Sequence, residues 1–227
     1  MDASSTTPEL TLYSSRISNA STRLPIALNL KQLPYKLVTI NLSKHEQHDI
    51  AFKVLNPAGT VPLLIHHHDG SAKPTIIGQS IAALEYLDEA FPNTKPLLPR
   101  DAASRARVRS LVALLAGDMH PLLTHRVSKA IRDLFPETET SDGTAAWHKH
   151  WVHDGMSKFE AVLAQSTVSG RFCVGDEITL ADVVLLPEVW FARRIGVQVS
   201  DFPRIEEICT RLCVVHEVRK EEQTLEG

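Results

Sequence analysis

Leu55-Asn56-Pro57-Ala58-Gly59-Thr60-Val61-Pro62-Leu63-Leu64 is the stretch that decides the fold. Its apolar end, continued by Ile65, predicts a strand over Val61–Ile65. Pro62 opens this strand, the position where a missing N–H costs least. A cis peptide bond before Pro62 would turn the backbone of Val61 outward, so that its N–H and C=O could pair with an extended peptide. The alternative is a simple loop before a strand.

The residues before this stretch predict a β-α-β unit. Strands are expected over Leu10–Tyr13 and over Tyr35–Leu42, where apolar residues alternate. Between them, Ile26–Leu30 carries the apolar spacing of a helix. Two strands joined by such a crossover are expected to be parallel, with a right-handed connection.

The residues after it predict a β-β-α unit. Pro74–Ile77 is expected to pair back on the strand at Val61 through a turn over His66–Ser71, which contains an Asp-Gly signal. A helix follows over Ser80–Ala90, with Ser80 as its N-cap. The order β-α-β followed by β-β-α predicts a thioredoxin-like N-terminal domain. The three consecutive histidines that begin at His66 are expected to lie in a solvated loop rather than to form a metal site.

The junction Gly78-Gln79-Ser80 ends a strand and opens a helix. Free N–H groups and the positive end of the helix dipole suit such a place to an anion, for example a carboxylate. The alternative is an ordinary capped helix.

The composition changes at Phe91–Pro99, where three prolines cannot continue a helix. We therefore expect a first domain over residues 1–92, a linker over 93–101 and an all-helical domain over 102–227, which makes the fold class α/β plus all-α. Five helices are expected in the second domain, with a polar loop over Pro136–Thr144: Ala102–Leu115, Met119–Leu134, Trp147–Gln165, Leu180–Arg193 and Ile205–Val218.

Composition excludes several classes of partner. The formal net charge of the 227 residues is −3, and no basic run suggests nucleic-acid binding. No apolar stretch approaches the roughly 20 residues that span a bilayer, and Met1–Pro8 is followed by no signal-peptide core. Three scattered cysteines are no disulfide framework, which favours a reducing compartment, the cytoplasm.

Leu55–Leu64, followed by Gln79-Ser80-Ile81, resembles a cytosolic glutathione transferase. Three further segments, Pro96–Asp101, Arg105–Arg109 and Phe172–Asp182, resemble the zeta class, which includes maleylacetoacetate isomerase. The likeness runs from about Leu10 to about Leu212. Within it, Thr179–Asp182 is a variant of the helix capping box, which is a folding element rather than a catalytic one.

This resemblance implies that glutathione is the cofactor and lies along the first domain. Val61, beside Pro62, would pair with the cysteinyl backbone. Gln79 and Ser80 would hold the γ-glutamyl end, and Gln47 the glycyl end.

The thiol of glutathione needs activation, since at a pKa of about 8.5 only about 3% of it is ionised at pH 7. In the family, a Ser-Ser-Cys run after the first strand does this work. Here an ungapped alignment gives Ser18-Asn19-Ala20, which keeps the serine that donates to the thiolate and loses the cysteine. Ile17 replaces the preceding arginine. Arg16 reaches the position of that arginine only if the loop shifts. Arg16 and Asn19 are the substrate-binding candidates of this segment.

Pro25 stands where the family helix has arginine, and a proline inside a helix costs about 3 kcal/mol or more. We therefore expect the first helix to begin near Ser21, with Ser21 as its N-cap, or to bend at Pro25.

In the second domain, Met119–Val127 resembles an isomerase segment whose histidine and arginine approach the acidic substrate. By this resemblance His120 lies beside the cofactor and Arg126 binds the substrate, while Leu123 and Thr124 replace asparagines. Arg194 matches an arginine that binds a substrate carboxylate, a task for which its planar fork is suited. A surface or structural role is the alternative for each residue.

The function expected from the resemblance is glutathione-dependent cis–trans isomerisation of a conjugated double bond by reversible addition of the thiolate. The small electrophilic substrate expected from the resemblance is maleylacetoacetate. Ile17 and Leu123 instead favour a less charged or larger molecule, and a related conjugated enone of secondary metabolism fits these changes. One alternative is a glutathione S-transferase that conjugates or dehalogenates small electrophiles. Another is a non-catalytic binding protein of the same fold. A homodimer is expected, without nucleic-acid or membrane partners.

Overall fold

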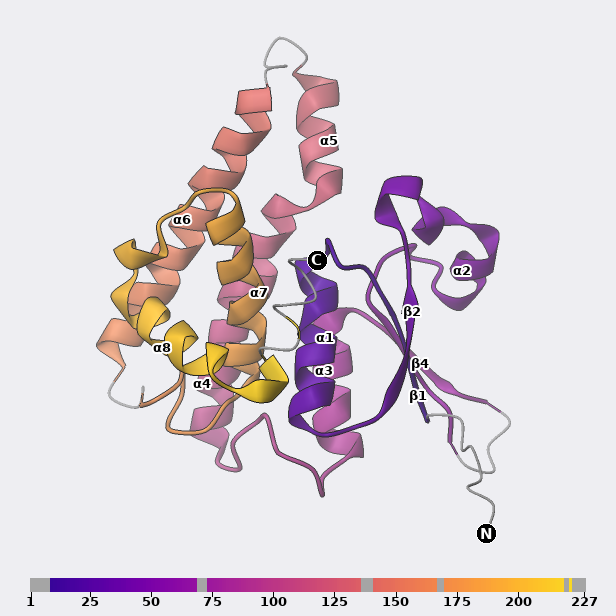
Figure 1. Cartoon of the computed structure of the whole chain (residues 1–227), viewed down its shortest axis with the longest axis horizontal. Helices are drawn as coiled ribbons and strands as arrows, with labels where there is room; N and C mark the ends of the chain where they lie inside the picture. The colour runs from indigo at the N-terminus through magenta and orange to yellow at the C-terminus, as the bar shows by residue number, and fades with distance from the viewer. Residues whose placement is uncertain (1–8, 69–72, 136–140, 167–169, 219–220, 222–227) are drawn as a thin grey trace. The chain divides into compact units, whose positions relative to one another are not determined.

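The computed structural model describes residues 9–68, 73–135, 141–166, 170–218 and 221 (Figure 1). These residues form two compact units, and each is described by itself. The first holds the chain up to Pro96 together with the residues from His216 on, and the second is Leu97–Val215. Residues 216–218 and 221 therefore belong to the first unit, whereas the sequence had assigned them to the helical domain.

The first unit is built on a four-stranded sheet with the order β2-β1-β3-β4. β1 (Leu10–Ser14) is parallel to β2 (Tyr35–Thr39) and antiparallel to β3 (Leu63–His66), which in turn is antiparallel to β4 (Thr75–Gly78). The predicted order of strands and the parallel first pair are therefore confirmed.

Two helices pack side by side on one face of this sheet, α1 (Asn19–Leu30) and α3 (Ser80–Ala90) (Figure 1). α2 (Ile50–Leu55) lies on the other side, after the 3₁₀ turns η1 (Leu42–Lys44) and η2 (Glu46–His48).

Two buried cations, one in α1 and one at its C-cap, reach α3. Arg23 Nη1 donates to Ser80 Oγ at 3.0 Å, and Lys31 Nζ lies 2.8 Å from Asp88 Oδ1. Polar contacts therefore join the two helices near both ends of α3.

The start of α1 differs from the prediction. The helix begins at Asn19 and its N-cap is Ser18, not Ser21, and Pro25 lies inside it. Pro25 has no N–H for the Ser21 carbonyl, but most of the helix is buried. Burial of an amphipathic face stabilises a helix more than local propensity does, so packing outweighs the missing bond.

Several strand boundaries also shift. β2 ends at Thr39, because Asn41 caps the following turn by accepting a hydrogen bond from Lys44 N at 3.1 Å. β3 begins two residues after Val61, and β4 ends at Gly78. The predicted turn signal Asp69-Gly70 lies outside the described residues.

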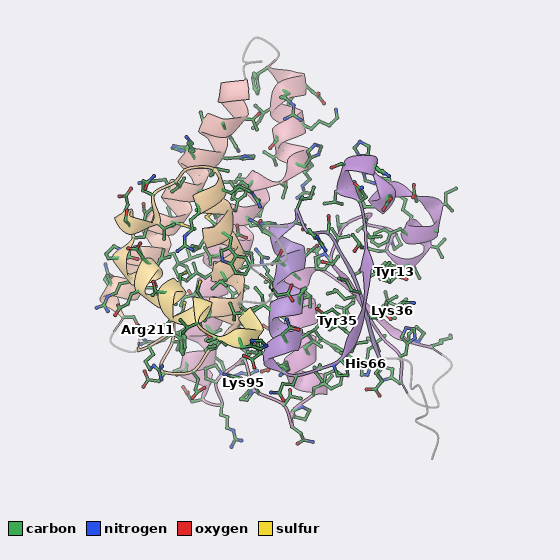
Figure 2. All side chains as sticks on the ribbon, viewed as in Figure 1. Tyr13, Tyr35, Lys36, His66, Lys95 and Arg211 are labelled. Atoms are coloured by element: carbon green, nitrogen blue, oxygen red, sulfur yellow. The ribbon has the colours of Figure 1, made fainter. Side chains whose placement is uncertain are left out.

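β3 also includes His66, so the prediction of a solvated loop is wrong for this residue. The side chain of His66, labelled in Figure 2, is buried. Its Nδ1 lies 2.7 Å from the hydroxyl of Tyr86. His67 and His68 are exposed. The described part of the chain holds no cluster of three metal-binding side chains.

The second unit is helical. Its elements are α4 (Ala102–Ala113), the π-helical η3 (Leu114–Met119), η4 (His120–Leu123), α5 (His125–Leu134), α6 (Ser141–Gln165), α7 (Leu180–Arg194), η6 (Val199–Asp201) and α8 (Pro203–Cys213). The expected helix over Met119–Leu134 is broken at Thr124, whose backbone is extended, into η4 and α5. The expected loop Pro136–Thr144 is helical from Ser141, and its residues 136–140 are not among those described.

α7 is the buried core helix of this unit, and its predicted capping box is confirmed. The carboxylate of Asp182 accepts hydrogen bonds from Thr179 N at 2.8 Å and from Cys173 N at 2.9 Å. Across the described residues, none of the helices is both long and apolar enough to cross a membrane.

Candidate functional site

The register of the sheet brings three chain segments to one edge. Tyr13, next to the last residue of β1, pairs with Leu63, the first residue of β3, and Leu63 pairs with Gly78, the last residue of β4. The segments that leave or enter the sheet there carry Ser18, Val61-Pro62 and Gln79-Ser80. The sequence candidates of the first unit therefore gather at one edge.

Ser18 combines two tasks at the start of α1. Its Oγ accepts a hydrogen bond from Ser21 N at 3.2 Å, which caps the helix. A hydroxyl has two acceptor lone pairs and one proton, so this cap leaves the proton of Ser18 available for donation. The side chain is half-buried beside the positive end of the helix dipole, a position that favours an anion.

The residues beside Ser18, where the sequence departs from the zeta-class pattern, differ in their exposure. Asn19 and Ala20 are half-buried, whereas Arg16 and Ile17 are exposed, Ile17 with 62% of its surface. Neither side chain before Ser18 is therefore held in the core.

The peptide bond between Val61 and Pro62 is cis, and Val61 precedes the first residue of β3. Asn56 shapes the loop before it, because its Nδ2 donates to Thr60 O at 2.7 Å and its Oδ1 accepts from Ala58 N at 3.3 Å.

Gln47 lies against this loop. A Cβ built on Gly59, whose φ is +60°, would stand 3.2 Å from the carbonyl oxygen of Gln47 and 3.1 Å from Nδ1 of His48. Only a residue without a side chain fits there easily, so η2 packs closely on the segment that leads to Val61.

Gln79 and Ser80 form the junction between β4 and α3. Gln79, not Ser80, is the N-cap, with a φ of +71°, and its side chain is exposed. Ser80 is the first helical residue and is buried, and its Oγ accepts the hydrogen bond from Arg23. A non-glycine residue at positive φ is uncommon and concentrates at functional sites.

Sequence reasoning missed Arg23, which is 1% exposed. A signal was present: Arg23 shares helical spacing with Ala27 and Leu30, so it lies on the buried face of α1.

The candidates of the second unit stand on three different elements. His120, in η4, has Nδ1 3.0 Å from Oε1 of Glu188 in α7, and Glu188 is fully buried. Arg126 in α5 and Arg194 at the end of α7 are exposed. The guanidinium of Arg194 lies 5.3 Å from the centre of the Phe191 ring, within the range of a cation–π contact.

Glu188 is the residue of this unit that the sequence analysis overlooked. A carboxylate within the apolar run Val183–Trp190 was the available signal, because buried acids almost always have a partner.

A mixed sheet of this order, a cis-proline before β3 and a direct passage from β4 into α3 are features of a thioredoxin-like binding domain. Profiles of the glutathione S-transferase N-terminal and C-terminal domains match residues 17–90 and 134–213. The chain belongs to the glutathione S-transferase family.

Similar proteins narrow this assignment. The chain is 45% identical over 211 residues to the maleylacetoacetate isomerase of Aspergillus fumigatus, covering 92% of this chain and 87% of the relative. A solved bacterial maleylpyruvate isomerase, described as a zeta-class glutathione transferase, is 36% identical with a TM-score of 0.84, covering 93% and 95% of the two chains. The maleylacetoacetate isomerase of Methylobacterium extorquens, solved with malonate and glutathione, is 29% identical with a TM-score of 0.86, covering 96% and 98%. The resemblance to the zeta class is confirmed.

Proposed function

We propose that this protein is a glutathione-dependent cis–trans isomerase of a conjugated double bond, of the maleylacetoacetate type. The observation that carries the proposal is the hydroxyl of Ser18, which caps α1 with a lone pair and keeps its proton for an anion at the sheet edge. The names of the similar proteins support the reaction, since they include maleylacetoacetate and maleylpyruvate isomerases.

The sheet edge fits glutathione as a cofactor. The N-terminus of α3, with the exposed Gln79 and the N–H of Ser80, suits the carboxylate of the γ-glutamyl end. Val61, just outside β3, would pair with the extended cysteinyl backbone beside Pro62. Gln47, on η2, would hold the glycyl end.

Bound glutathione would supply the thiolate that adds to the cis double bond and leaves after the bond has rotated. The hydroxyl of Ser18 would donate a hydrogen bond to that sulfur, and the positive end of the α1 dipole would stabilise the thiolate further. Lowering the pKa of a thiol by about two units requires about 2.7 kcal/mol of selective stabilisation of the thiolate. A hydrogen bond to a charged group contributes about 1.5–3 kcal/mol, so one hydroxyl provides a large share.

The second unit would bind the acidic substrate. Arg126 and Arg194 are exposed cations suited to carboxylates or to an enolate. The zeta-class resemblance assigns cofactor binding to His120, whose Nδ1 lies 3.0 Å from Oε1 of the buried Glu188. In the first unit, Arg16 and Asn19 lie close to Ser18 in the sequence and are the substrate-binding candidates.

One observation favours a second function, glutathione conjugation or dehalogenation of small electrophiles. Ile17 is 62% exposed and apolar where the zeta-class pattern has arginine, which suits a less charged substrate. The same Ser18 mechanism would serve it, without the elimination that regenerates glutathione.

The test is incubation with glutathione and maleylacetone, a simple cis enone, with the geometry of the double bond followed by NMR. We expect the cis alkene to become trans at constant glutathione concentration. Loss of the alkene into a stable adduct would favour conjugation, and the absence of any reaction with a panel of electrophiles, despite glutathione binding, would favour a non-catalytic protein.

A homodimer in the cytoplasm completes the proposal. Both are typical of the family, and Cys173, Cys209 and Cys213 form no disulfide, which suits a reducing compartment. Sedimentation of the full chain tests the dimer.

A further inference from the structure

We infer that Arg23 is a positioning residue, which turns the hydroxyl of Ser80 into a hydrogen-bond donor for the α-carboxylate of the γ-glutamyl group. This inference rests on the proposed function, because it concerns the same cofactor. It adds a residue that would touch neither glutathione nor substrate.

The contact that carries the inference is buried. Arg23 Nη1 lies 3.0 Å from Ser80 Oγ, and the two residues are 1% and 5% exposed. Arg23 comes from the middle of α1 and Ser80 is the first residue of α3, so the bond crosses between two helices.

The direction of this hydrogen bond is fixed by chemistry. A guanidinium has only donors, so Ser80 Oγ must be the acceptor. The single hydroxyl proton of Ser80 is then left for another partner, and that partner must be an acceptor. A neutral partner in place of Arg23 could itself accept this proton and remove the preference.

A main-chain donor and the helix dipole share this place. The N–H of Ser80 belongs to the first turn of α3, where main-chain donors have no partner within the helix. The helix dipole adds about half a positive charge there. The hydroxyl, the N–H and the positive end of the helix dipole therefore favour a carboxylate rather than a neutral group.

The chain offers a matched control in Lys31. It is also a buried cation, at the C-cap of α1, and its Nζ lies 2.8 Å from Oδ1 of Asp88 at the other end of α3. Removing Lys31 damages the α1–α3 contact without touching Ser80, so it separates loss of stability from loss of positioning.

The experiment is calorimetric titration with glutathione and with 4-aminobutyryl-cysteinylglycine, which lacks only the α-carboxylate of the γ-glutamyl group. The wild type is expected to prefer glutathione. Arg23→Met is expected to reduce this preference about tenfold while binding the analogue as before. Ser80→Ala is expected to reduce it similarly, and the double variant no further, because the two residues act as one unit.

Lys31→Met is expected to lower the unfolding temperature and keep the full preference. Arg23→Lys and Arg23→Gln keep the test valid if Arg23→Met does not fold. Lysine is donor-only and is expected to retain most of the preference, whereas the glutamine amide can also accept and is expected to lose it.

Equal preference in the wild type and in the Arg23→Met variant, or equal behaviour of the lysine and glutamine variants, would overturn the inference and leave glutathione binding intact. A wild type that binds both peptides equally would instead contradict the assignment of the γ-glutamyl end to Gln79 and Ser80.

Discussion

Ser18 is a single side chain with two separable tasks, because the cap uses a lone pair and activation of a thiol uses the proton. Most substitutions would remove both. Serine in this place therefore links the folding of α1 to the proposed chemistry.

Substitutions at Ser18 should separate these tasks. Ser18→Ala is expected to lose about 1 kcal/mol of stability, because the helix cap is removed. It is also expected to raise the pKa of the thiol of bound glutathione, because the hydroxyl donor is lost. Ser18→Asp keeps the acceptor that caps α1, so it should retain the wild-type unfolding temperature and still lose activity. Ser18→Thr keeps both groups and should retain both properties. Thermal unfolding and thiolate absorbance against pH measure them. Full activity of Ser18→Ala with normal glutathione affinity would refute the role of Ser18.

Gln79 carries backbone strain at the same edge, with its φ of +71°. Such a conformation costs a residue with a side chain about 1–2 kcal/mol, which glycine avoids. We therefore expect Gln79→Gly to be about 1 kcal/mol more stable than Gln79→Ala, since both lack the amide and only glycine relieves the strain. Both variants should lose the same glutathione affinity, as measured by calorimetry alongside thermal unfolding. Unequal affinities would mean that the backbone, rather than the amide, governs binding.

At the scale of residues, the sequence pointed to Ser18, Val61 and Gln79 because their motifs are local in the chain. It could not point to the partner of Ser80, because the Arg23–Ser80 contact joins residues 57 positions apart. The same holds for His120 and Glu188, which meet only once η4 and α7 are packed.

At the scale of elements, the ends of a helix were predicted correctly where the local sequence signals were strong. α3 was predicted with its observed ends, because Gly78 and Phe91-Pro92 bracket its apolar spacing. α1 was placed too late, because the proline penalty was weighed without the burial that offsets it. The reverse error joined η4 and α5 into one helix, although the extended backbone of Thr124 separates them and Leu123 alone is buried in η4.

The packing of β3 on α3 includes a titratable contact. His66 bonds to the Tyr86 hydroxyl at 2.7 Å and contacts the ring of Phe91. Burial lowers the pKa of His66, the neighbouring His68 and His67 lower it further, and Glu9, 3.9 Å away, opposes them. The folded state therefore holds this imidazole neutral.

The sign of the pH effect follows. Below the unfolded pKa of about 6.5, the unfolded chain takes up a proton that folded His66 resists, so acid favours unfolding. We expect the unfolding temperature to fall between pH 7 and pH 5, and to fall less in His66→Gln, whose amide can still bond to Tyr86. Some pH dependence should remain, since burial also lowers the pKa of His148. Identical pH profiles for the wild type and His66→Gln would contradict this role.

At the scale of the whole molecule, the chain returns to its first unit after completing the second. Asn29 Nδ2 donates to Glu217 O at 3.3 Å and to Glu221 Oε1 at 2.8 Å, and Val218 is 1% exposed. A boundary drawn from local composition misses this, because nothing near residue 216 marks a change of unit. The last described residues therefore contribute to the stability of a unit whose other elements end before the linker.

Tyr35 of β2, labelled in Figure 2, reports on this contact. Burial, followed by the charge of Glu221, raises the pKa of Tyr35 to about 12. A raised phenol pKa means that the folded state is favoured while Tyr35 is neutral, and that stability is lost as the pH rises above the unfolded value of about 10. Removing residues 216–227 is expected to bring the titration of Tyr35 closer to pH 10 and to lower the unfolding temperature of the first unit, and Glu221→Gln should have a smaller effect. Ultraviolet titration of the phenolate measures this, with Tyr35→Phe identifying the transition. An unchanged Tyr35 titration in the shortened chain would show that the returning segment does not cover β2 in solution.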